Sequence, residues 1–335
     1  MTAKDSISVK LTVSVSKVDE YINSLLKDRK PVVLYEASRH IFHAGGKRLR
    51  PYLVLKSCEL VGGDPDLALP FAAGLEILHS FTLIHDDIMD NDSIRRGAPT
   101  IHSKWGVPVA IASGDLLFAK VYQAMYAPYF DGSLPGDRVL ESIRAVTDAT
   151  ISICEGQVLD VSFPDTRDVS PEDYIIMVGD KTSELFKACA EIGAIVGGAD
   201  KGDVERLGSF VWDAGIAFQI VDDILGATAD EEILGKPVGS DMREGKKTLI
   251  IVHALENASP GEKRAILKVL GDDNADPRDI EAANEALAST GTIDYAKGKA
   301  AEYVRSSKES LGAFPDVQAR RDLFELIDYF SSRDH

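Results

Sequence analysis

The sequence predicts an all-α protein that forms a single domain over its 335 residues. Apolar residues recur at helical intervals from Val18 to the C-terminus, whereas alternating strand patterns are nearly absent. The one alternating stretch, Ile7–Val15, is as typical of an irregular tail as of a strand, so we expect residues 1–17 to lie outside the helical body. No Pro/Ser-rich linker divides the chain, and its glycine-bearing stretches are short enough to be loops.

Composition excludes several classes of protein. Hydrophobic residues make up 44% and charged residues 27% of the chain, as in ordinary globular proteins. The formal net charge of −17 argues against nucleic acid as a partner, because binding phosphate backbones needs a basic surface. No apolar run approaches the roughly 20 residues that cross a bilayer, and the N-terminus lacks a signal-peptide pattern. We therefore expect no transmembrane segment and a cytoplasmic location.

The three cysteines, Cys58, Cys154 and Cys189, lie far apart in the sequence. None forms a pair at the spacing of a metal site, and isolated cysteines in apolar helical patterns are usually buried thiols. The sequence therefore predicts buried thiols, and neither disulfides nor zinc are expected.

The first segment that carries chemistry is a predicted helix from Leu67 to Asp90. Pro70 lies near its start, where proline suits a first helical turn. Because His79, Asp86 and Asp90 are spaced i, i+7 and i+11, they fall on one stripe of this helix. The segment thus brings carboxylates to the C-terminal end of a largely apolar helix.

The second segment is a predicted helix that starts at Asp203 as N-cap and runs to Gly226. Gln219, Asp222 and Asp223 are spaced i, i+3 and i+4, so they share one face near the end of the helix. Each of the two helices therefore carries an aspartate pair near its C-terminal end and continues into a basic loop.

Clustered aspartates are costly unless something compensates their charge. Asp86, Asp87 and Asp90 repel one another within one helical turn, and Mg²⁺ relieves such repulsion while keeping positions open for phosphate oxygens. A lone cluster is more often a solvated acidic helix end. Two clusters, each following apolar residues, favour instead a facing set that holds several Mg²⁺ ions around a diphosphate.

Cations bracket both acidic clusters, although surface cations are in general merely solvated. Gly46–Pro51 contains Lys47, Arg48 and Arg50, and Arg95 with Arg96 follows the first cluster. The glycine-rich loop after the second cluster contributes further cations, namely Lys236, Lys246 and Lys247. Arginine pairs suit bidentate recognition of phosphate. The pattern predicts one anion pocket bridged by Mg²⁺ and a second formed directly by Lys and Arg.

These motifs resemble those of the trans-isoprenyl diphosphate synthases, or polyprenyl synthetases, over roughly Val32 to Leu255. Within that family the chain is similar to archaeal-type geranylgeranyl diphosphate synthases. The resemblance is carried by five motifs in order: Gly46–Pro51, Asp86–Gly97, Lys181-Thr182, Gln219 with Asp222-Asp223, and Gly235–Lys247. It implies an all-α bundle of about ten core helices around a central cavity, normally a homodimer.

The resemblance also implies residue roles. It assigns metal ligation to Asp86, Asp90 and Asp222, with Asp87 and Asp223 in support. It assigns isopentenyl diphosphate to Lys47, Arg50, His79 and Arg96. It assigns the allylic diphosphate to Arg95, Lys181, Thr182, Gln219, Lys236 and Lys246, with Lys181 also catalytic. Many members carry a third aspartate in the second motif where this chain has Gly226, so the sequence leaves the number of metal contacts there open. We expect Gly226 to end the helix.

The implied reaction joins isopentenyl diphosphate to dimethylallyl, geranyl or farnesyl diphosphate, with Mg²⁺ stabilising the departing diphosphate. Phe81 followed by Thr82, with Leu78 a turn further away, resembles the pattern that limits the product to geranylgeranyl diphosphate (C20). Phe81 as ordinary core is the alternative. Other interpretations are a farnesyl, mixed C15/C20 or longer-chain synthase, a class I terpene cyclase, or a non-catalytic partner subunit.

Overall fold

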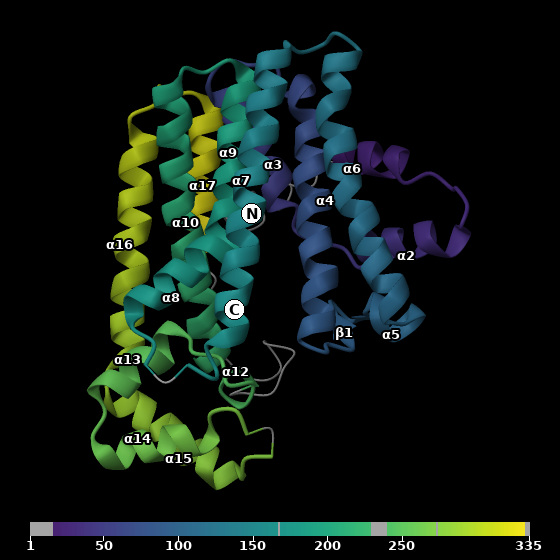
Figure 1. The fold of residues 1–335 in the computed structure, drawn as a ribbon. Helices are drawn as coiled ribbons and strands as arrows, with labels where there is room; N and C mark the ends of the chain where they lie inside the picture. Colours follow the sequence, from purple (N-terminus) through teal and green to yellow (C-terminus); the bar gives the residue numbers. More distant parts are fainter. Residues whose placement is uncertain (1–15, 167, 229–239, 273, 332–335) are drawn as a thin grey trace, which may run out of the picture. The chain divides into compact units, whose positions relative to one another are not determined.

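The computed structural model describes residues 16–166, 168–228, 240–272 and 274–331, and its fold is all-α as predicted (Figure 1). The first described helix spans residues 16–25, so residues 16 and 17 are helical and not part of a tail. The Ile7–Val15 stretch, Gly235 and Lys236 lie outside the described residues. Within the described part of the chain, the strands are β1 (Ile94–Arg95) and β2 (Ala98–Pro99), a short antiparallel pair that the sequence did not predict.

The chain divides into two compact units. The first comprises residues 1–148, 188–208 and 314–325, and the second comprises 149–187, 209–313 and 326–335. Four helices contribute residues to both units: α7 (Gly136–Ser162), α9 (Glu184–Gly197), α10 (Lys201–Thr228) and α17 (Gln318–Ser331). A single domain over residues 1–335 stays a prediction.

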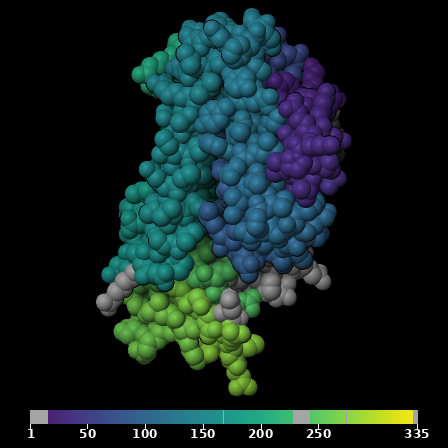
Figure 2. All heavy atoms as spheres, turned by 45° about the vertical axis from the view of Figure 1, so that its right-hand side comes forward, coloured from purple at the N-terminus to yellow at the C-terminus, as the bar shows by residue number. Residues whose placement is uncertain are grey.

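The first unit is built around two long helices that lie side by side, α4 (Pro65–Met89) and α6 (Val107–Phe130). Its other helices are the helix of residues 16–25, α2 (Val32–His43), α3 (Leu49–Leu60) and α5 (Ile101–Trp105). Figure 2 shows residues 16–43, in purple, beside the blue surface of this unit. The core is apolar: Phe71, Leu75, Leu117 and Val121 are fully buried.

The second unit holds the remaining elements. These are α8 (Pro171–Val178), η1 (Gly179–Ser183), α12 (Ser240–Arg243), α13 (Leu249–Asn257), α14 (Pro260–Val269), α15 (Pro277–Ser289) and α16 (Thr292–Gly312). Its core cluster includes Ile216, Ile220, Leu249 and Ala296. The η1 segment is a single π-helical turn, and such turns occur frequently at functional sites.

Three predicted helix ends were wrong. The helix of the first motif begins at Pro65 behind the N-cap Asp64, so Pro70 lies inside it rather than in its first turn. The second begins at Lys201, because the Asp200 side chain accepts a hydrogen bond of 2.9 Å from the Asp203 amide. It continues to Thr228, so Gly226 does not end it.

Two expectations about the whole chain also need correction or comment. Cys58 and Cys189 are buried, but Cys154 is exposed on α7, so the prediction of three buried thiols was wrong for that residue. By length and composition α4 could cross a membrane, although 61% of its most apolar window is buried, as in the core helix of a water-soluble protein. The expectation of no transmembrane segment stays a prediction.

Candidate active site

The first acidic cluster lies at the C-terminal end of α4. Asp86 and Asp87 are in its last turn, and Asp90 is the C-cap residue whose amide donates to the Asp86 carbonyl at 2.8 Å. The C-terminus of a helix carries partial negative charge, so three carboxylates there are repelled by the helix end as well as by one another. A bound cation would relieve this repulsion, and the oxygen-only donor set suits a hard divalent ion.

Asp87 is the buried member of this cluster. The residue is 3% exposed, and the Nε of Arg95 donates a hydrogen bond to its Oδ1. Burial raises the pKa of Asp87, and the Arg95 guanidinium opposes that rise. Arg95 belongs to β1 and also approaches Asp92, at 3.7 Å. Asp86 is only partly buried and Asp90 is exposed.

A basic region of the same unit surrounds His79. Burial and the charges of four arginines lower the pKa of His79 well below its usual range. In order of effect these are Arg50, Arg96, Arg95 and Arg48. A neutral imidazole in a field of guanidinium groups can donate or accept a hydrogen bond, while the arginines supply positive potential for a diphosphate. Lys47, the fourth residue predicted here, is exposed.

Arg48, by contrast, has a structural role. It precedes α3 in a left-handed conformation, and its guanidinium bonds to Asp19 and Glu76, each at 2.9 Å. Gly46 leaves room for two guanidinium groups, because a Cβ there would lie 2.6 Å from Nη1 of Arg96 and 2.9 Å from Nη1 of Arg48. Arg96 itself donates to the Gly45 carbonyl.

A pocket of about 20 Å³ adjoins these cations in the first unit. Arg95, Arg96, Asp87 and His40 contribute to its lining. The Nε2 of His40 lies 2.8 Å from the Pro99 carbonyl oxygen, which joins α2 to the β1–β2 hairpin. Sequence reasoning did not identify His40, which carries no motif of its own.

A larger pocket of about 210 Å³ lies within the second unit. It gathers six predicted site residues, namely Lys181, Thr182, Gln219, Asp222, Asp223 and Lys246. Lys247 lines it too, and its Nζ donates to the Thr166 carbonyl. Lys236 lies outside the described residues, so the structure does not test its role.

Asp223 is held by neutral donors. The Tyr174 hydroxyl donates to its Oδ2 at 2.6 Å, and the Gln219 amide donates to its Oδ1 at 3.0 Å. Tyr174 is 1% exposed, and its burial, followed by the charge of Asp223, raises the pKa of the phenol well above its usual value. Asp223 is therefore fixed by the protein, whereas Asp222, one residue earlier on α10, is only partly buried and lines the pocket.

The π-helical turn η1 positions Lys181 and Thr182 in this pocket. Glycine lets other helices approach it: a Cβ on Gly156 would lie 2.3 Å from the Lys181 amide nitrogen, and one on Gly215 would lie 2.6 Å from the Ser183 hydroxyl. The Nζ of Lys181 donates to Asp160 at 2.5 Å, and the Thr182 hydroxyl lies 3.4 Å from the Gln219 carbonyl. Lys246 pairs with Glu244 at 2.7 Å.

Asp160 and Tyr174 are the site residues that sequence reasoning missed. Both line the pocket and contact predicted residues, Lys181 and Asp223 respectively. Asp160 follows Gly156, against which η1 packs, by one helical turn, but the sequence gives no signal of that packing. Tyr174 follows the N-cap Ser170 of α8 and gave no signal either.

The residues predicted to limit product length lie on α4 in the first unit. Leu78 is fully buried, and Phe81 packs against Phe118 of α6 with ring centroids 5.2 Å apart. Phe118 in turn contacts Tyr122 at 5.4 Å. The Thr82 hydroxyl donates to the His79 carbonyl at 2.9 Å. Phe81 is thus part of an aromatic group that the α4 sequence alone does not reveal.

Neither acidic cluster is a closed metal cage. Among the residues that the structure describes, no group of three or more His, Cys, Asp or Glu side chains is arranged to hold an ion. Mg²⁺ is often bound through one or two carboxylates together with substrate phosphates and water. The partly buried or exposed Asp86, Asp90 and Asp222 fit that mode of binding.

Comparison with known proteins decides the family. The family model for polyprenyl synthetase matches residues 31–287. The chain belongs to the polyprenyl synthetase family. It is a prenyltransferase of isoprenoid biosynthesis, which confirms the fold class, the enzyme class and the family expected from the motifs.

Two relatives match nearly the whole chain. A geranylgeranyl diphosphate synthase of Sulfolobus acidocaldarius is 43% identical over 309 residues, covering 92% of each chain. A short chain isoprenyl diphosphate synthase of Methanothermobacter thermautotrophicus is 42% identical over 317 residues, covering 95% of each. Both relatives are isoprenyl diphosphate synthases, in agreement with the reaction class that the sequence predicts.

Two solved structures have the same fold. The geranylgeranyl pyrophosphate synthetase of Pyrococcus horikoshii is 40% identical, with a TM-score of 0.94 over 99% of this chain and 100% of that one. A polyprenyl synthase of Caulobacter crescentus, complexed with calcium and isoprenyl diphosphate, is 30% identical, with a TM-score of 0.88 over 99% and 98%. A divalent metal ion therefore belongs to the chemistry of this polyprenyl synthetase family.

Proposed function

We propose that this polyprenyl synthetase condenses isopentenyl diphosphate with an allylic diphosphate in a Mg²⁺-dependent reaction, and that its main product is geranylgeranyl diphosphate. The observation that carries the proposal is the second-unit pocket, where one cavity collects three carboxylates, three lysines and the Thr182–Gln219 pair. That combination of anionic and cationic groups suits a metal-bridged diphosphate.

In this proposal the two units contribute different binding groups. Arg50, Arg96 and His79, with Lys47, bind isopentenyl diphosphate, since the arginines that lower the pKa of His79 supply the positive potential. Arg95, Lys181, Thr182, Gln219 and Lys246 bind the allylic diphosphate, as does Lys236, which lies outside the described residues. Asp86, Asp90 and Asp222 hold Mg²⁺.

Bound Mg²⁺ would act as a Lewis acid and neutralise charge on the leaving diphosphate. The protein's own contribution is positional and electrostatic. Tyr174 and Gln219 fix Asp223, Arg95 fixes Asp87, and Asp160 orients Lys181, so charges need little reorganisation as the allylic C–O bond breaks. The double bond of isopentenyl diphosphate then attacks the allylic carbon, and a proton leaves to the released diphosphate, so no side chain serves as nucleophile.

Product length is proposed to depend on the aromatic group that contains Phe81. Phe81, with Leu78 and Thr82 beside it on α4, would stop the growing chain, and its contact with Phe118 would prevent it from turning aside. The name of the Sulfolobus relative supports a C20 product. The name of the Methanothermobacter relative is compatible with the alternative of farnesyl or mixed C15/C20 products.

The deciding experiment supplies the full chain with Mg²⁺, isopentenyl diphosphate and, separately, dimethylallyl, geranyl or farnesyl diphosphate, and sizes the products by mass spectrometry. A dominant C20 diphosphate that disappears with EDTA is expected. Phe81→Ala should lengthen the products, while Phe163→Leu in the second unit should leave their length unchanged. Absence of elongation by the folded protein would favour a terpene cyclase or a non-catalytic subunit.

We further propose a homodimer in the cytoplasm, each protomer a single domain. An apolar stripe on α7 supports the dimer: Leu140, Ile151, Val158 and Val161 are 69%, 53%, 68% and 56% exposed and follow the a and d positions of a heptad. Val158→Asp should shift the protein toward monomer in sedimentation experiments. Leu267→Asp on α14, where the side chain is 56% exposed, is the matched control.

A further inference from the structure

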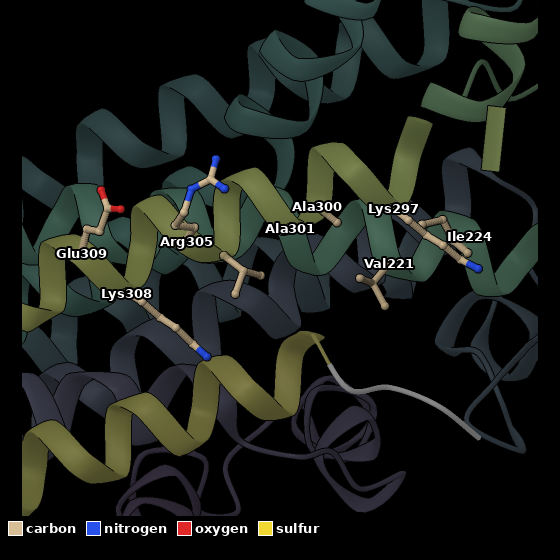
Figure 3. Close-up of a pocket in the computed structure, with 9 residues that line it drawn as sticks. Val221, Ile224, Lys297, Ala300, Ala301, Arg305, Lys308 and Glu309 are labelled. Atoms are coloured by element: carbon tan, nitrogen blue, oxygen red, sulfur yellow. The ribbon is translucent and has the colours of Figure 1, made fainter. Parts of the chain in front are cut away.

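A second pocket of the second unit lies on the opposite face of α10 from the diphosphate pocket. It has a volume of about 560 Å³ and runs between α10 and α16 (Figure 3). Cavities of roughly 300–1,000 Å³ are the usual size for small-molecule ligands. None of the residues assigned above to the polyprenyl synthetase reaction lines it.

Helix geometry separates the two pockets. Gln219 and Asp223 lie four residues apart on one face of α10, whereas Val221 and Ile224 fall on roughly the opposite side of the helix. Gln219 and Asp223 line the diphosphate pocket, and Val221 and Ile224 line the second one. One helix therefore carries both.

The floor of the α10–α16 pocket is apolar. Val221 and Ile224 come from α10, and Ala300, Ala301 and Val304 come from α16. Ile224 is 8% and Ala300 6% exposed, so these side chains also belong to the core. The two helices are fixed against each other by Ser307, whose hydroxyl donates to the Phe210 carbonyl at 2.8 Å, so the floor is preformed.

Lysines stand at the two ends of this apolar floor. Lys297 and Lys308 extend to the same side of the helices as Val221, whereas Arg305 and Glu309 project on the other side of α16 (Figure 3). Lys308 pairs with Asp328 at 2.5 Å. Lys297 has no ion-pair partner within the described ranges, although the protein carries a net charge of −17. Lys297 is thus a cation available to an outside anion.

We propose that the α10–α16 pocket binds an amphiphilic anion, a linear isoprenoid chain that ends in a phosphate or diphosphate. The headgroup would bind Lys297, and the hydrocarbon would cover Val221, Ala300 and Val304. From Lys297 to Val304 the helix rises about 10 Å, which gives the part of the hydrocarbon next to the headgroup an apolar surface to cover. That such a ligand would be the product of this enzyme rests on the proposed function. The binding of an amphiphilic anion in the pocket does not depend on it.

The test is hydrogen exchange of the full chain with geranylgeranyl diphosphate, kept below its micelle concentration, in EDTA and without isopentenyl diphosphate. Amides of residues 297–309 should exchange at least about twofold more slowly with the ligand. Inorganic diphosphate, which lacks the hydrocarbon, should not protect them. If inorganic diphosphate, without any hydrocarbon, protected the amides of residues 297–309, the proposal would be overturned.

Two variants locate the binding. Lys297→Glu should weaken the affinity about tenfold, because a charge-assisted contact becomes repulsive. Ala301→Trp should fill the floor and abolish protection. Lys299→Glu is the matched control: it reverses a lysine two residues away that already pairs with Glu302 at 2.9 Å, and it should keep wild-type affinity. Equal affinity of Lys297→Glu and Lys299→Glu would refute the assignment.

Two further outcomes separate this proposal from its alternatives. Protection by vesicles of anionic phospholipid but not by the soluble ligand would assign this face to a membrane surface and overturn the proposal. Protection of 297–309 in a protein that shows no elongation would defeat the proposed function and support the pocket. Elongation without protection would do the reverse.

Discussion

Asp87 of the first unit and Asp223 of the second are both buried aspartates, but different donors hold them. Asp87, 3% exposed, is paired with a charged guanidinium from the β1–β2 hairpin. Asp223, 9% exposed, receives hydrogen bonds from a phenol and an amide, both neutral. In each set a neighbouring aspartate, Asp86 or Asp222, remains partly exposed.

The comparison assigns two tasks within each acidic set. A buried carboxylate that the protein already bonds is suited to orient the set, whereas a more exposed one can exchange partners when a metal ion arrives. The difference in donors also has a physical consequence. Removing the charge of Asp87 leaves the Arg95 cation behind, whereas the phenol and the amide that donate to Asp223 carry no charge.

The largest expected effect tests whether the two partly exposed aspartates, Asp86 and Asp222, are equivalent. Asp86→Ala and Asp222→Ala should each lower kcat/KM by about 10³-fold, because each removes a carboxylate proposed to hold Mg²⁺ near the leaving diphosphate. Glu20→Ala removes an exposed carboxylate of the first unit and should keep wild-type activity. Steady-state kinetics with titrated Mg²⁺ measures this. A near-normal Asp222→Ala would break the equivalence and leave the first set as the metal site.

The second prediction compares the two buried aspartates, Asp87 and Asp223. Asp87→Asn should destabilise the fold by about 2 kcal/mol, since it leaves the Arg95 guanidinium with its longer contact to Asp92 at 3.7 Å; the 27% exposure of the Arg95 side chain keeps the cost below that of a fully buried pair. Asp223→Asn should cost about 1 kcal/mol, because Tyr174 can still donate to the amide oxygen. Urea unfolding of both variants gives the two values. Equal costs would show that the charge of the donor does not matter.

Much of this arrangement was readable from local spacing. Gln219, Asp222 and Asp223 had to share a face of a helix because 3.6 residues make a turn, and the structure places all three in one pocket. Lys181 and Thr182 were known only through the family resemblance, whereas Lys246 was also singled out by the pattern of cations; all three line the same pocket. Local periodicity and motif order therefore predicted the members of the pocket.

The partners of these residues were not readable. Tyr174 and Asp160 reach the pocket from α8 and α7, so their contacts depend on tertiary packing that no local pattern encodes. The π-helical turn η1 packs closely against Gly156, where a Cβ would lie 2.3 Å from the Lys181 amide nitrogen. Helix ends were misplaced for a related reason: Asp64 and Asp200 cap helices whose first turns look polar in sequence.

The third prediction tests the neutral donor of the second unit. Tyr174→Phe keeps the volume of a fully buried ring but removes the hydroxyl that donates to Asp223. Activity should fall about tenfold, as expected for loss of a group that orients a metal-site carboxylate. Stability should fall by no more than about 1.5 kcal/mol. Tyr303→Phe, in the same unit, is the control for loss of a phenol hydroxyl. Unchanged activity of Tyr174→Phe would mean that the Tyr174 hydroxyl is not needed to hold Asp223.

The smallest expected effect is a dependence of stability on pH, which should arise mainly from His79 of the first unit. Burial and four arginines lower the pKa of His79, so below its ordinary value of 6.5 the unfolded chain binds a proton that the folded chain does not. Stability should therefore fall as pH drops, by about 1.4 kcal/mol between pH 7.5 and 5.5 for this residue. His79→Gln should remove that part of the slope in urea unfolding. His253→Gln should remove less, because Glu256 opposes the effect of burial there. A slope that is the same in wild type and His79→Gln would show that the arginines do not control the charge of this histidine.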